Sequence, residues 1–190
     1  MWGPRLEGRI VRLRPIAESE IPTLTVWFAD PLVLRLLGGP LVAVSPAQEK
    51  EWWETSGSDW QSVHWGLEWQ GRLVGETSIT QIDWMSRKGM TGTAIGYRTA
   101  WRQGIATEAM RIRAEYAFRQ LDLHKLDSGY FDTNVGSGEA QRRAGYREVG
   151  RLRDELFRDG RWYDLILTEL LRGDWEAAQR PETRRETGGG

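Results

Sequence analysis

The stretch Ile95–Phe118, IGYRTAWRQGIATEAMRIRAEYAF, constrains the possible folds of this chain more than any other. An apolar segment ends at Gly96-Tyr97, a turn follows around Gly104, and apolar residues then recur at helical spacing through Tyr116. A helix that starts from such a turn leaves the N–H groups of its first turn without partners, and its dipole favours negative charge there. The stretch therefore predicts an anion site, which we interpret as a diphosphate cradle.

Two familiar phosphate-binding motifs are excluded. The chain contains no G-x-x-x-x-G-K-[ST] run, so it lacks the loop of nucleoside triphosphatases. A dinucleotide-type run begins at Gly136 and Gly138, but Gln141 stands where the third glycine belongs.

Composition narrows the class of protein further. The 190 residues suit one domain, and the net charge of −1 argues against a nucleic-acid partner. The chain has no cysteine and two histidines, so we expect no disulfide and no metal site. We see no signal peptide and no apolar run of the roughly 20 residues that span a bilayer, so we expect a cytoplasmic protein without a membrane partner.

The order of elements predicts a single-domain mixed α/β sandwich over residues 1–175. Strands are expected at 8–14, 63–69, 72–82, 91–97, 124–131, 146–152 and 162–171, and helices from about 18 to 30, 45 to 55, 104 to 120 and 135 to 144. Residues 32–44 are expected to form a loop with one helical turn, residues 154–159 an irregular connector, and residues 176–190 a disordered tail.

Three segments resemble one family. Trp101–Ala109, WRQGIATEA, is similar to the W-x-x-G-x-A-T-E-A form of the Q/R-x-x-G-x-G/A turn of GCN5-related N-acetyltransferases, in their RimJ/RimL-like branch. Leu123–Gly150 resembles the family's L-H-R-I…N-x-x-S…G-F/Y segment, and Arg153–Trp175 resembles its closing hairpin. Together the three segments cover about half of the chain in the family's order.

The resemblance implies a central, mostly antiparallel twisted sheet of about six or seven strands, flanked by about four helices, with strands four and five splayed. It implies transfer of an acetyl group from acetyl-CoA to a primary amine, either a protein N-terminal α-amine or a small molecule such as an antibiotic. A catalytically weak CoA-binding or sensing module is the alternative. We expect a monomer or homodimer. The cofactor-binding residues implied are Ile95, Gly96, Tyr97, Arg102, Gln103, Gly104, Ile105, Ala106, Thr107 and Asn134.

Two catalytic residues follow from the same resemblance. Ser137, in the N-x-x-S positions, is the candidate proton donor to the leaving thiolate, because Gln141 replaces the tyrosine that many acetyltransferases use. The alternative is that Ser137 caps the following helix. Glu76 is the candidate general base, with Glu68 and Asp83 as rivals.

Other roles stay open at this stage. Asn134 either contacts pantetheine or holds its turn, and Arg102 either meets a CoA phosphate or is a solvated surface side chain. His64 could line the acceptor cleft. The chain departs from the family pattern in the short segment Ile95–Ala100 and in having Arg102 where glycine is frequent. Residues 45–84 carry seven acidic and two basic side chains, which either form an acidic wall that attracts a cationic amine or lie mostly on the solvated outer face of a helix and a hairpin.

Overall fold

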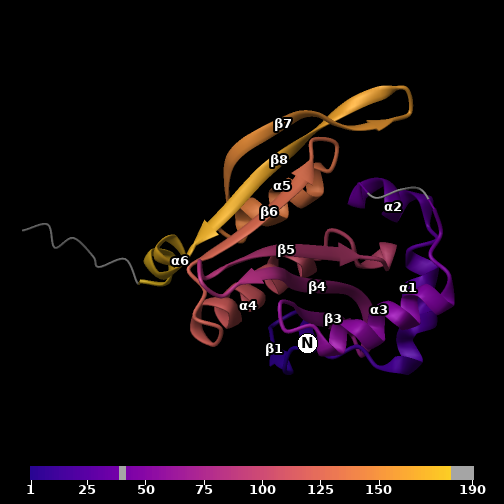
Figure 1. Cartoon of the computed structure of the whole chain (residues 1–190), viewed down its shortest axis with the longest axis horizontal. Helices are drawn as coiled ribbons and strands as arrows, with labels where there is room; N and C mark the ends of the chain where they lie inside the picture. The colour runs from indigo at the N-terminus through magenta and orange to yellow at the C-terminus, as the bar shows by residue number, and fades with distance from the viewer. Residues whose placement is uncertain (39–41, 181–190) are drawn as a thin grey trace, which may run out of the picture.

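A single eight-stranded sheet runs through the molecule in the order β1-β2-β3-β4-β5-β6-β8-β7 (Figure 1). The structure is a computed structural model that describes residues 1–38 and 42–180. Its strands are β1 (Leu6–Glu7), β2 (Arg12–Arg14), β3 (Val63–Trp69), β4 (Arg72–Asp83), β5 (Lys88–Ile95), β6 (Lys125–Phe131), β7 (Arg147–Arg158) and β8 (Arg161–Leu171). All neighbours are antiparallel except β5 and β6, which are parallel.

The described residues form six α-helices, α1 (Ile21–Trp27), α2 (Pro31–Leu37), α3 (Pro46–Ser58), α4 (Ile105–Arg119), α5 (Val135–Arg143) and α6 (Arg172–Gln179). The mixed α/β fold with one mostly antiparallel sheet is thus as predicted, with one more strand and two more helices than expected. The strand predicted at 8–14 was too long, since β2 covers only Arg12–Arg14 and residues 8–11 form a turn. The extra strand is β1, Leu6–Glu7, which precedes this turn and pairs with β2.

The sheet carries a separate apolar core on each face. On one face α4 packs against β2, β4 and β5 and buries Ala109, Ala114 and Phe118 in the larger core. On the other face α1 and α3 cover a smaller core that includes Leu24 and Trp27. Ser45 caps α3 by accepting the N–H of Gln48, as the cap-then-proline pattern predicts.

The sheet opens between β5 and β6. Their main chains pair only from Lys88–Lys125 to Met90–Asp127. At the end of this pairing, side-chain hydrogen bonds replace the main-chain ones between the strands. Thr91 Oγ1 donates to Asp127 O at 2.9 Å, and Ser128 Oγ donates to Thr91 O at 3.1 Å. Beyond this point the strands diverge, which confirms the splayed pair that the family resemblance implies.

Three local predictions were wrong. The segment 32–44, expected to be a loop with one helical turn, begins with the longer helix α2 at 31–37, because Asp30 accepts the N–H of Leu32 as a cap and Pro31 starts the helix. Residues 39–41 of that segment lie outside the described residues. Residues 154–159 belong largely to β7, which accommodates them in a bulge between Leu152 and Leu156.

The tail prediction was wrong for residues 176–179, which lie in α6. This helix is held because Trp175 packs on Phe118 at a ring distance of 5.4 Å and lies under the Arg119 guanidinium. Residues 181–190 lie outside the described part of the chain. Among the described residues, no helix is both long and apolar enough to cross a membrane.

Candidate active site

The predicted cradle is a left-handed turn followed by the N-terminus of α4. Gly104 is the N-cap of α4 with φ +80°, and within the described part of the chain the helix start has no side-chain cap. Arg102 also has a positive φ, +63°, which explains why glycine is frequent at its position in the family and shows that arginine accepts this strain here. The carbonyl of Gly104 accepts from Glu108 N at 3.0 Å, so the turn is joined rigidly to the helix.

A cavity of about 460 Å³ lies in front of this turn. Its wall is formed mainly by the cradle and by α5, and the lining residues are Ile95, Ala100, Arg102, Gly104, Ile105, Ala106, Thr107, Val135, Gly136, Glu139, Ala140 and Arg143. A Cβ at Gly104 would have only Ile10 Cδ1 nearby, at 3.5 Å, so the space over the turn is left open. Open space, free N–H groups and two arginines fit a diphosphate.

A second cavity, of about 350 Å³, occupies the opening between β5 and β6. We call it the wedge cavity. It is lined by Val33, Leu36, Leu37, Thr93, Ala94, Ile95, Trp101, Arg102, Ala106, Met110, Thr133, Asn134, Val135, Gly136, Ser137 and Ala140. Ile95, Arg102 and Ala106 line both cavities, so the two spaces adjoin one another. The wedge cavity and the cradle therefore offer one path from the sheet opening to the anion site.

The predicted pair Asn134 and Ser137 lies on the wall of the wedge cavity. Asn134, and not Ser137, caps α5, because its Oδ1 accepts from Ser137 N at 3.1 Å. Its Nδ2 donates to Leu36 O at 2.9 Å, so Asn134 also ties down the C-terminal end of α2. Asn134 thus holds its turn and the helix that covers the cavity.

The hydroxyl of Ser137 is left available. Ser137 Oγ accepts from Gln141 Nε2 at 3.2 Å, and no described group accepts its proton. Gln141 is buried, and its Oε1 accepts from Thr168 Oγ1 while its Nε2 also donates to Gly129 O. Because the Ser137 oxygen already accepts from Gln141, the O–H proton of Ser137 is left to be donated toward the cavity.

Glu76 and Glu49 form an acidic pair on β4 and α3. Glu49 is 5% exposed, and Glu76 keeps partial solvent access although protein atoms surround its carboxylate. Burial, together with the negative charge of Glu49, raises the pKa of Glu76 to about 7, and burial also raises the pKa of Glu49. Neither carboxylate has an ion-pair or hydrogen-bond partner among the residues that the structure describes. A carboxylate with a pKa near neutrality suits a general base.

The rival bases are engaged elsewhere. Glu68 is bonded to Arg14 and Arg12, and these contacts lower its pKa. Asp83 accepts from Ser86 and Met85 in a turn, which lowers its pKa as well. Of the predicted acidic wall, Glu54 and Asp59 also have nearby cations or turn donors, so Glu49 and Glu76 are its buried, uncompensated part.

Other predicted residues lie away from the cavities. Gly96 is buried against Trp27, whose ring would lie 2.1 Å from a Cβ there. Tyr97 N donates to Val74 O and Tyr97 Oη accepts from Arg72, and Gln103 lines neither of the two cavities. His64 packs edge-on against Trp2 and Trp52 in an aromatic cluster, where burial lowers its pKa to about 4.

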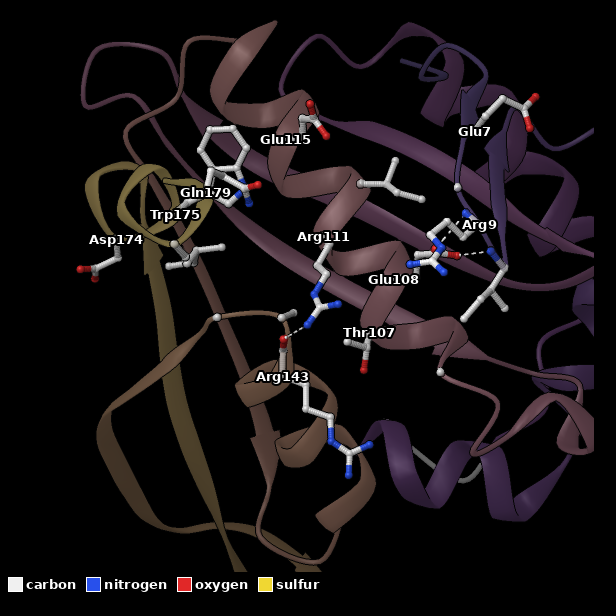
Figure 2. Close-up of a pocket in the computed structure, with 18 of the residues that line it drawn as sticks. Glu7, Arg9, Thr107, Glu108, Arg111, Glu115, Arg143, Asp174, Trp175 and Gln179 are labelled. Carbon is white, nitrogen blue, oxygen red and sulfur yellow. Dashed lines mark hydrogen bonds between the residues drawn. The ribbon is translucent and has the colours of Figure 1, made fainter. Parts of the chain in front are cut away.

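Glu108 is a site residue that the sequence analysis did not identify. Its carboxylate accepts two main-chain N–H groups that Figure 2 draws, from Arg9 at 2.9 Å and Ile10 at 2.6 Å. It also accepts the next one, from Val11 at 2.8 Å. The turn between β1 and β2 is thereby fixed beside Gly104. The glutamate of the A-T-E-A run was the available signal, but only the fold brings the turn, almost 100 residues away in sequence, against it.

Figure 2 also shows a large groove that continues from Thr107 along α4 to Trp175 and Gln179 of α6. It encloses about 1360 Å³ and is crossed by Arg111, which donates to Arg143 O. The groove is continuous with the cradle, and charged side chains border it. Its volume would accommodate the larger part of a nucleotide-containing ligand. No group of three or more potential metal-ligating side chains occurs in the described ranges.

Comparison with known families identifies the class of protein. The family described as Acetyltransferase (GNAT) domain matches residues 11–147. The chain therefore belongs to the GNAT acetyltransferases, and it is an acetyl-CoA-dependent N-acyltransferase.

Among curated relatives, the chain is 32% identical over 127 residues to YdaF of Bacillus subtilis (strain 168), whose name provisionally calls it a ribosomal N-acetyltransferase. That match covers 65% of this chain and 67% of YdaF. The [ribosomal protein uS5]-alanine N-acetyltransferase of Escherichia coli (strain K12) is 33% identical over 85 residues, which is 44% of this chain and 43% of that protein.

The fold is shared with solved structures. A spermidine N-acetyltransferase from Vibrio cholerae, in complex with CoA and spermine, superposes with a TM-score of 0.81 at 18% identity, covering 89% of this chain and 99% of that one. RimL, a ribosomal L7/L12 α-N-protein acetyltransferase in complex with coenzyme A, superposes with a TM-score of 0.78 at 16% identity, covering 88% and 98%. These identities establish a common fold only.

Proposed function

We propose that this enzyme acetylates a primary amine on a positively charged acceptor. The observation that carries the proposal is the pair of carboxylates formed by buried Glu49 and half-buried Glu76, which has no cationic partner among the described residues. An acceptor with a second cationic group would supply the missing charge. A polyamine and a basic peptide both meet this requirement, and a spermidine N-acetyltransferase shares the fold of this chain.

In the proposed mechanism, Glu76 removes the proton from the acceptor ammonium, directly or through one water. The amine nitrogen then attacks the thioester carbonyl carbon and the C–S bond breaks. Ser137 donates its proton to the departing sulfur and is reprotonated by the second proton that the nitrogen loses as the amide forms. A pKa of about 7 supports the role of Glu76, since a large share of such a carboxylate is ionised at neutral pH and the ionised form is basic enough to take the proton. The free hydroxyl proton of Ser137 and its bond from Gln141 support the second role.

Acetyl-CoA would be held by the cradle, with its diphosphate at the α4 N-terminus and its pantetheine arm in the wedge cavity. Gly104, Ala106 and Thr107 would bind the diphosphate through main-chain N–H groups, helped by Arg102. Ile95 and Thr93 would border the pantetheine arm. This placement supplies the positioning from which most of the rate enhancement would come.

The test is release of free thiol from acetyl-CoA with a panel of amines matched in size. We expect polyamines or basic peptides to outperform neutral amines, and the KM of the winning acceptor to rise with ionic strength. Glu49→Gln should raise that KM, whereas Glu51→Gln, on the exposed side of the same helix, should not. A neutral or acidic amine that wins with a salt-insensitive KM would refute the charged acceptor.

The absence of the tyrosine that many acetyltransferases use favours a second candidate, a CoA-binding module with weak catalysis. In that case calorimetry would show CoA binding, while no amine in the panel would release thiol. Turnover with any of the amines would reject the module.

A further inference from the structure

Arg113 is a buried cation in the middle of α4 and has no role in the site described above. Its side chain is 1% exposed and lies among the apolar residues of the larger core. Nη1 donates to Thr77 Oγ1 at 2.6 Å, Gly92 O at 2.6 Å and Thr93 Oγ1 at 2.9 Å, and Nη2 donates to Tyr146 Oη at 3.1 Å.

All four acceptors are neutral. No carboxylate lies within ion-pair distance of Arg113 in the described residues, and its Nε has no hydrogen-bond partner there. Burying a guanidinium without a counter-charge costs stability, and an apolar side chain in the same position would avoid that cost. The charge is therefore difficult to explain as core packing alone.

The acceptors place this charge at the opening of the sheet. Gly92 and Thr93 lie in β5 just past the point where β5 stops pairing with β6, and Tyr146 also contacts Thr91 at that point. Thr93 lines the wedge cavity, as does Met110, one turn before Arg113 on α4. The guanidinium thus donates directly to a residue of the cavity wall. Arg102 is the other cation at this cavity in the described residues, but it is exposed and screened by solvent.

We propose that Arg113 is a positioning residue that acts through Thr93 and the β5 main chain to favour negative charge on the CoA sulfur in the wedge cavity. The inference rests on the proposed placement of the pantetheine arm. When the C–S bond breaks, its electron pair leaves with the sulfur. A fixed positive charge in a region of low dielectric constant stabilises that sulfur until it receives a proton. A guanidinium suits this role because it stays charged when buried, unlike an amine.

The experiment titrates the thiol of bound CoA by the ultraviolet absorbance of its thiolate. In the wild type, the thiol should titrate at a pH lower than that of free CoA by on the order of one unit. Arg113→Gln keeps hydrogen-bonding capacity without charge and should lose the shift, whereas Arg113→Lys should retain most of it. Tyr146→Phe removes one acceptor of the same guanidinium away from the cavity and should leave the shift unchanged. Arg102→Gln measures how much of the shift in the titration of the thiol comes from the exposed guanidinium of Arg102.

A shift that survives in Arg113→Gln, or that disappears in Arg102→Gln instead, would overturn the role of Arg113. If Arg113→Gln does not fold, the wild-type protein is tested by comparing its affinities for CoA and desulfo-CoA over a range of pH. Because a lowered thiol pKa in the complex favours binding of the thiolate, the affinity for CoA relative to desulfo-CoA must rise with pH below the pKa of the free thiol. A constant ratio in that range overturns the inference. Failure of CoA to bind at all would overturn the proposed placement as well, so the two failures are distinguishable.

Discussion

Glu108 should hold the β1–β2 turn against the cradle, and its replacement gives a prediction that can be worked from the contacts. A hydrogen bond to a charged group contributes about 1.5–3 kcal/mol, and the carboxylate accepts three. The N–H groups of Arg9 and Ile10 are exposed, so water replaces Glu108 there at little cost, while that of Val11 is partly buried. We therefore expect Glu108→Ala to lower the free energy of unfolding by about 2–4 kcal/mol. For a chain of this size that corresponds to a Tm lower by roughly 5–15 °C.

The same variant should weaken acetyl-CoA binding, because Ile10 of this turn is the side chain nearest to the open space over Gly104. A loss of about 1.4 kcal/mol in preorganisation would lower the affinity tenfold. Thermal unfolding with and without acetyl-CoA measures both effects. Glu115→Ala is the matched control, since Glu115 lies on the same helix, borders the same groove and is exposed. Equal Tm values and equal ligand-induced shifts in the two variants would refute the role of Glu108.

Four further predictions concern the cradle and the two proposed catalytic residues. Gly104→Glu should abolish the thermal stabilisation by acetyl-CoA, whereas Gly160→Glu, with a similar φ of +76° in an open turn, should strain the chain equally and keep it. Ser137→Ala should lower kcat by roughly 10- to 1000-fold with little change in CoA affinity, and an unchanged kcat would reject Ser137 as the acid. Wild-type kcat/KM should rise with pH through about 7, and Glu76→Gln should remove this rise. Because burial raises the pKa of Glu76, its contribution to stability should be lost between pH 4.5 and 7, and Glu76→Gln should flatten that loss in chemical denaturation.

The cradle was predictable because it is local. The turn around Gly104, the start of α4 and the cap of α3 each depend on residues within a few positions of one another. The turn between β3 and β4 at Gln70-Gly71 is equally local, and both residues take positive φ. The motif and the structure agree at these places because short-range chemistry decides the backbone.

The parts that the sequence did not reveal depend on contacts between distant segments. α2 looked like a loop, yet its last carbonyls accept from Asn134 and Arg158, about 100 residues later or more. Residues 154–159 lack a clear strand pattern, but pairing with β8 orders them as a bulged strand. The acidic wall of 45–84 was predicted as one surface, and the arginines of β2 neutralise Glu68 within it. Local patterns contain no information on these pairings.

The opening between β5 and β6 links the fold to the chemistry. Hydrogen bonds between main-chain groups stabilise a sheet, so an interruption inside it leaves N–H and C=O groups that need other partners. The hydroxyls of Thr91 and Ser128 satisfy the carbonyls where the pairing ends, but they reach no further along the strands. Residues 93–95 then border the wedge cavity. A ligand with amide groups spaced along an extended arm would continue the sheet there, as an added strand does. We therefore expect desulfo-CoA to slow amide hydrogen exchange in 91–95 as well as in the cradle, and a ligand that carries only the adenosine diphosphate end to slow it in the cradle alone. Protection of 91–95 by the shorter ligand would place the arm elsewhere.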